Sequence, residues 1–200
     1  MKGKSPMARQ SKLWLTNALL TRPMEPRYAR AEDLKPKNRP VIAVPFNTYA
    51  DGNPPDRSNA AIAGLAHKYL RREKSLFIGQ REHTNILSQR GFDVRIFESE
   101  DCERVESQRL VGWQANVVHG LSNGQEVILV GLPDHLGRVA MLCEYFGLVP
   151  IIPPECKGVP YDSNDRLGAQ WWCKTPQVFR PYEMCVARPG TIAKLWLGMF

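Results

Sequence analysis

The chain has 200 residues, of which 43% are hydrophobic and 24% are charged, a balance typical of globular proteins that excludes a largely disordered chain. Its net charge of +7 lies in residues 1–39, where ten Lys and Arg stand against three Asp and Glu. Residues 40–200 are neutral overall, which excludes a nucleic-acid-binding surface spread over the whole chain. The length predicts one domain with an appendage.

Residues 1–39 are therefore interpreted as a basic extension, and residues 40–200 as the main domain. Within the extension, Ser11–Leu20 has the pattern of a short helix. Its apolar side carries Trp14, Leu15, Ala18 and Leu19. Two interpretations stay open: a helix packed on the main domain, which is favoured, or a weak membrane-interface anchor or partner contact.

Short apolar runs alternate with helical patterns between residues 41 and 152. The predicted strands are 41–46, 76–79, 94–97, 127–131 and 148–152, and the predicted helices are 57–70, 82–90, 103–119 and 134–146. This alternation predicts an α/β fold, a Rossmann-like doubly wound parallel sheet of about five strands with flanking helices. Ligands of such sheets bind outside the carboxyl ends of the strands.

From about Pro153 the chain becomes irregular and is predicted to cover one end of the sheet. Thr175–Pro181 is expected to form a loop or short helices, followed by a helical region from Arg180. The apolar end, Ile192–Phe200, is interpreted as a docked C-terminal helix.

The five cysteines are scattered and form no CxxC pair, and no Cys/His group has the spacing of metal ligands. An odd, scattered set of this kind predicts reduced thiols in a cytoplasmic protein without a metal site. No apolar run approaches the roughly eighteen residues of a membrane-spanning helix, and no signal peptide is predicted.

The most informative stretch is Glu126–Gly147, which has the pattern of a buried strand, a turn and a helix. Asp134 is predicted as the N-cap, which places His135 and Arg138 on one face of the first turn. Gly147 is expected as the C-terminal cap. A cation and an imidazole beside free backbone amides favour binding of a phosphate, carboxylate or other anion. The alternative is that both side chains are merely solvated.

Glu106, near the start of the predicted helix 103–119, is expected to face His135 and Arg138 across the crevice. A carboxylate beside an imidazole and a guanidinium provides a general base with an anion clamp, as phosphate-ester hydrolysis needs. The alternative is a structural Glu–Arg ion pair. His83, at another predicted helix start, is a further candidate. The GxGxxG, P-loop and GxSxG fingerprints are absent.

Four segments carry a resemblance to a known family. Val130–Val139 matches a [ST]-x-x-H-x-x-R-A segment, Ile78–Gln80 partly matches a turn after the second strand, and Tyr182–Glu183 matches a Glu near the C-terminal helix. Glu106 is retained from a polar segment that opens a long helix. Over about residues 40–190 the chain thus resembles the SanA/YdcF/ElyC-like family of bacterial proteins.

The resemblance implies a Rossmann-like pocket, in a family linked with S-adenosylmethionine binding or with envelope and lipid-carrier metabolism. The expected catalytic residues are Glu106 and His135, and the expected ligand-binding residues are Asn47, Gly79, Gln80, Asp134, Arg138 and Glu183.

Two functions follow as hypotheses. The first is a binding protein or enzyme, a hydrolase or transferase, for a nucleotide-like or phosphate-bearing ligand, with S-adenosylmethionine as the candidate cofactor. The second is a non-catalytic interaction protein whose residues 1–39 bind an acidic partner, a membrane surface or nucleic acid. The sequence leaves the oligomeric state open.

Overall fold

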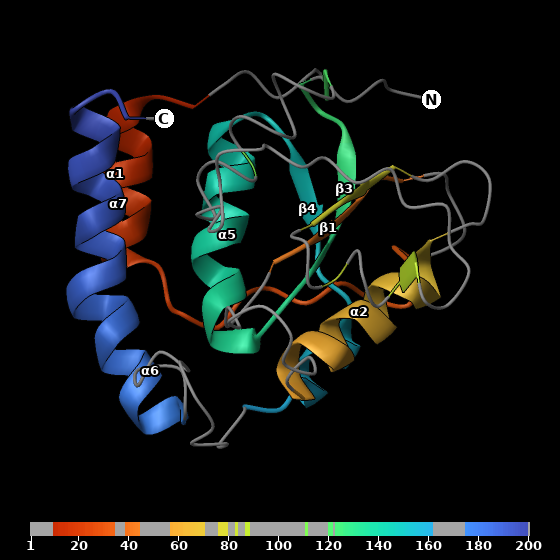
Figure 1. Ribbon diagram of the computed structural model, residues 1–200. Helices are drawn as coiled ribbons and strands as arrows, with labels where there is room; N and C mark the ends of the chain where they lie inside the picture. Colours follow the sequence, from red (N-terminus) through yellow and green to blue (C-terminus); the bar gives the residue numbers. More distant parts are fainter. Residues whose placement is uncertain are drawn as a thin grey trace.

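The computed structural model describes residues 10–34, 39–44, 57–70, 76–79, 83, 87–88, 111, 120–121, 123–161 and 175–199 (Figure 1). Its strands are β1 (Val41–Ala43), β2 (Phe77–Ile78), β3 (Glu126–Val130) and β4 (Val149–Ile151). The helical elements are α1 (Lys12–Thr21), α2 (Arg57–Tyr69), α5 (Pro133–Tyr145), η2 (Pro154–Gly158), α6 (Pro176–Tyr182), η4 (Glu183–Ala187) and α7 (Arg188–Trp196). None of the helices in these ranges is long and apolar enough to cross a membrane.

The four strands form one parallel sheet in the order β2-β1-β3-β4, which confirms the predicted α/β class. Within the described ranges the sheet thus has four strands rather than five. The strand predicted at 94–97 lies outside the described residues, as do most of the helices predicted at 82–90 and 103–119.

The order of the strands indicates where an open parallel sheet of this kind binds its ligand. The chain passes from β1 through α2 to β2 on one side, and from β3 through α5 to β4 on the other. Right-handed crossovers in opposite directions bring the two helices to opposite faces of the sheet, as Figure 1 shows. The strand order therefore switches between β1 and β3, and sheets of this kind bind their ligands beyond the carboxyl ends of the two strands at the switch.

Helices on both faces explain why the strands are apolar without alternation. Every residue of β1 is buried, and so are four of the five residues of β3. The core continues into α2 through Ile62 and Ala66, and into α5 through Leu136, Val139 and Leu142.

α1 is part of the same core. Leu15, Ala18 and Leu19 are buried, and α1 packs against both α5 and α7. The structure thus agrees with the interpretation of a helix packed on the main domain. The outer helical layer consists of α1 and the C-terminal helix, as Figure 1 shows at the left.

The C-terminal helix begins earlier than predicted. α6, η4 and α7 follow one another with helical backbone angles at both junctions, so one helix runs from Pro176 to Trp196. η4 is a π-helical turn that ends at Ala187, two residues before Pro189. Proline lacks the backbone N–H that an α-helix needs, and π-helical turns occur mostly as single-turn bulges inside α-helices.

The two ends of α5 differ in how well the sequence predicts them. Gly147 follows the helix with φ of 81°, and the Gly147 and Leu148 amides donate to the carbonyls of Glu144 and Cys143 at 3.0 and 2.9 Å. These bonds form a Schellman motif, and the predicted cap is confirmed. The N-cap, however, is Leu132 and not Asp134. Pro133 suits the first helical position because its φ is fixed and no N–H is lost there, so Asp134 lies one position inside the helix.

Gly137 lies where the N-terminal segment crosses α5. A Cβ atom at this position would lie 2.0 Å from the carbonyl oxygen of Met24. The crossing backbone is therefore in direct contact with the helix, and only glycine leaves room for it.

We predict that Gly137→Ala lowers the free energy of unfolding by about 1–3 kcal/mol, because the added methyl group displaces the crossing segment. Gly190→Ala is the matched control, since Gly190 is also helical and a Cβ there meets nothing within 4 Å. The control should raise the free energy of unfolding by up to about 1 kcal/mol, because alanine has a higher helix propensity than glycine. Urea denaturation measures both, and an equal gain for Gly137→Ala would contradict the close approach.

Candidate functional site

The start of α5 already holds a carboxylate of its own. Oδ2 of Asp134 accepts hydrogen bonds from Tyr161 Oη at 2.6 Å and from Arg180 Nε at 2.9 Å. The Asp134 side chain is nearly buried and lies in the first turn, where negative charge is stabilised by the helix dipole. Asp134 thus provides the negative charge at the helix start where the sequence predicts an external anion.

Arg138 is not a free cation. Its Nε lies 2.7 Å from Oε1 of Glu183, and its Nη1 lies 3.4 Å from Oγ1 of Thr191. The side chains of Arg138 and Glu183 are 8% and 0% exposed. The structure therefore brings two of the predicted ligand-binding residues together, as partners of each other in a buried ion pair between α5 and the C-terminal helix.

Arg188 completes this buried cluster. Its Nε lies 3.9 Å from Oε1 of Glu183. Its Nη1 donates to the carbonyls of Leu19 and Arg22 at 3.0 and 2.7 Å, and its Nη2 donates to that of Pro23 at 3.2 Å. Burial lowers the pKa of Arg188, while Glu183 favours its charged form. The guanidinium thereby fixes the end of α1 to the start of α7.

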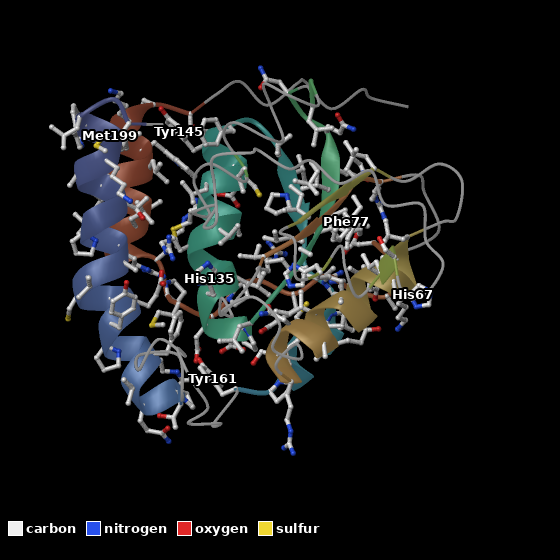
Figure 2. The ribbon with its side chains drawn as sticks, in the orientation of Figure 1. His67, Phe77, His135, Tyr145, Tyr161 and Met199 are labelled. Carbon is white, nitrogen blue, oxygen red and sulfur yellow. The ribbon has the colours of Figure 1, made fainter. Side chains whose placement is uncertain are left out.

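His135 is a neutral side chain in this environment. Burial, and secondarily the charge of Arg138, hold the pKa of His135 well below its ordinary value of 6.5. Its ring lies 6.0 Å from that of Phe179, centroid to centroid. Figure 2 labels His135 on α5 and Tyr161 beyond the start of that helix. A neutral imidazole can exchange hydrogen bonds with a ligand, but it adds no positive charge to an anion clamp.

A second polar group lies at the carboxyl end of β2. His83 is fully buried, and its Nε2 lies 3.1 Å from Oδ1 of Asn59 in the first turn of α2. With that oxygen as acceptor, Nε2 carries the proton and Nδ1 carries a lone pair. Among the described residues, Nδ1 has no hydrogen-bond partner. Burial lowers the pKa of His83 to about 3, so this acceptor stays uncharged.

Gly79, a predicted ligand-binding residue, lies directly beside this group. A Cβ at Gly79 would lie 3.5 Å from Nδ1 of His83 and 2.6 Å from the ring of Phe77. Glycine at the end of β2 therefore leaves room for the ring of Phe77, next to Nδ1 of His83.

The other predicted site residues, Asn47, Gln80 and Glu106, lie outside the described residues. The expected approach of Glu106 to His135 and Arg138 stays a prediction, although Arg138 already has Glu183 as its carboxylate partner. In the ranges that the structure covers, no three Asp, Glu, His or Cys side chains come together as metal ligands.

Sequence reasoning missed Arg180, Tyr161 and Arg188. Arg180 is 62% exposed although its Nε is bonded to Asp134, which raises the pKa of the guanidinium. No local spacing signals these partners, because 27 and 46 residues separate Asp134 from Tyr161 and Arg180. Only the fold brings them to the start of α5.

Comparisons of the chain with protein-family models, curated proteins and solved structures find no match.

We predict that Glu183→Gln lowers the free energy of unfolding by about 3–5 kcal/mol, because it leaves two buried guanidinium groups without a counter-charge. Glu144→Gln is the control, since Glu144 pairs with Arg22 at the partly exposed end of α5. Its effect should stay within about 1 kcal/mol. Similar losses in the two variants would show that the buried cluster has no special role in stability.

The pH dependence of stability provides a test of His83. The pKa of His83 is lowered from the ordinary 6.5 to about 3 in the folded chain. Between these two pH values the unfolded chain therefore binds a proton at His83 that the folded chain excludes. Acidification through this interval therefore lowers stability, by up to about 1.4 kcal/mol per pH unit for this one group. We expect His83→Gln to remove that part of the slope, as measured by urea denaturation over a pH series. An unchanged slope would contradict a neutral, buried His83.

Proposed function

We propose that the protein binds a nucleotide-like, phosphate-bearing small molecule in the crevice beyond the carboxyl ends of β1 and β3. The switch in strand order at these two strands carries the proposal, because doubly wound sheets bind their ligands at this position. α2 and α5 begin beside the crevice, so their first turns are the parts of the helices nearest to a ligand there.

Arg180 is the cation that we assign to the phosphate. Its Nε is held by the nearly buried carboxylate of Asp134, while most of the side chain remains exposed. A guanidinium anchored in this way loses less conformational freedom when its other N–H groups bind an anion. Arg138 is a poorer candidate because an external phosphate would have to displace Glu183 from a buried ion pair.

His83 supplies a second, uncharged contact. Its Nδ1 is a buried acceptor beside Gly79 at the carboxyl end of β2. A hydrogen-bond donor such as an exocyclic amine or a sugar hydroxyl would satisfy it, and nucleotide-like ligands carry such donors. This complementarity supports a nucleoside phosphate over an inorganic anion.

Membership of the SanA/YdcF/ElyC-like family, S-adenosylmethionine as a cofactor, and a cytoplasmic location are parts of the same proposal. The location rests on the scattered cysteines of the sequence. Catalysis by His135 and Glu106 would require a general base. The lowered pKa of His135 makes its imidazole a weak base.

Isothermal titration calorimetry with adenosine monophosphate, adenosine, S-adenosylmethionine and inorganic phosphate tests the proposal. We expect adenosine monophosphate to bind, and Arg180→Ala to weaken it roughly tenfold to a hundredfold through loss of a charged hydrogen bond. Adenosine, which lacks the phosphate, should bind both proteins equally.

Arg22→Ala is the matched control, because Arg22 is also a partly exposed arginine paired with a carboxylate of α5, but at the other end of the helix. It should leave the affinity for adenosine monophosphate unchanged. Absence of any heat of binding with all four compounds, or equal weakening by both substitutions, would contradict the proposal.

A further inference from the structure

The large apolar side chains that remain exposed are concentrated in the outer helical layer. All of those in the described part of the chain belong to α1 or to residues 184–199. They are Leu13, Leu20, Met184, Val186, Trp196, Leu197 and Met199. Single exposed apolar residues are ordinary, but their concentration on two neighbouring helices marks an interaction surface.

The spacing of these residues places several of them on one continuous surface. On the C-terminal helix, Val186, Pro189, Ala193 and Trp196 are exposed and follow one another at intervals of three, four and three residues, which is one helical stripe. On α1, Leu13 and Leu20 lie on either side of Thr16 at the same kind of interval.

The two stripes meet where Trp196 donates from Nε1 to Oγ1 of Thr16 at 3.0 Å. The helices run antiparallel, since Arg188 at the other end of α7 binds the carbonyl of Leu19 at the other end of α1. We call this surface, formed by Leu13, Leu20, Val186, Trp196 and Leu197, the α1/α7 patch.

The exposed charges on the described residues of α1, α6, η4 and α7 are all positive. Lys12 lies over the ring of Trp196, with Nζ 5.9 Å from the centroid, and Lys194 lies on α7 itself. The described residues of α1, α6, η4 and α7 include a single carboxylate, Glu183, which is fully buried. A second copy docked on this patch would oppose like charges, so self-association is disfavoured. An anionic surface is the complementary occupant.

We propose that the α1/α7 patch docks the protein onto the surface of a membrane rich in anionic phospholipid. The leucine and valine side chains enter the boundary between headgroups and acyl chains, and Trp196 lies at the depth that tryptophan prefers. Lys12 and Lys194 interact with the phosphate groups. The domain lies on the bilayer and does not cross it.

Co-sedimentation with vesicles of phosphatidylcholine alone, or of equal parts phosphatidylcholine and phosphatidylglycerol, tests the proposal. We expect binding to the mixed vesicles alone, weakened by high salt. Lys12→Gln with Lys194→Gln should weaken it roughly fivefold per removed lysine. Leu20→Ser with Leu197→Ser should weaken it roughly tenfold or more by removing inserted apolar surface.

The control is Lys68→Gln with Lys157→Gln, which removes two lysines from α2 and η2, outside the α1/α7 patch. These charges should not affect vesicle binding. Equal binding to both vesicle types, no binding to either, or equal loss in the control and patch variants would overturn the proposal. A concentration-dependent dimer that the leucine substitutions abolish, as measured by sedimentation equilibrium, would assign the patch to a second copy instead. Circular dichroism establishes that each variant is folded.

Discussion

The buried carboxylate of Glu183 lies at the contact between α1, α5 and α7 and binds side chains from two of these helices. Arg138 reaches it from α5, and Arg188 reaches it from the start of α7 while also binding the carbonyls at the end of α1. Desolvation of three charges is costly, and only close partners offset that cost. Because the three helices meet at this point, the position of the outer layer on α5 depends on it.

This arrangement changes the functional interpretation of the α5 start. A motif with His135 and Arg138 one turn apart suggests an anion clamp, yet Arg138 neutralises an internal carboxylate and burial keeps His135 uncharged. Asp134 in turn compensates the positive end of the helix. Among the described residues bonded to this end of α5, Arg180 keeps an exposed charge, and only the fold brings it there. Binding of a phosphate-bearing ligand, as proposed, therefore uses a residue from the C-terminal helix.

The sequence predicted those features that depend on neighbours along the chain. Apolar runs that alternate with helical patterns located the four strands of the described sheet. Gly147 marked the end of α5, because the positive φ at that position favours glycine. The N-cap was misplaced because Pro133 takes the first helical position. The partner of Arg138 was beyond prediction, since it lies 45 residues away. The position of Glu183 follows from how the C-terminal helix packs, and the spacing of nearby residues in the sequence does not predict that packing.

Side-chain NMR of the arginine Nε–H groups during titration with adenosine monophosphate tests most directly whether Arg138 is structural while Arg180 meets the ligand. We predict that the Nε–H of Arg138, being buried against Glu183, exchanges slowly with solvent and keeps its chemical shift throughout the titration. The Nε–H of Arg180 should shift in step with binding. A fast-exchanging Arg138 resonance that moves with added nucleotide, beside an unmoved Arg180 resonance, would contradict the account.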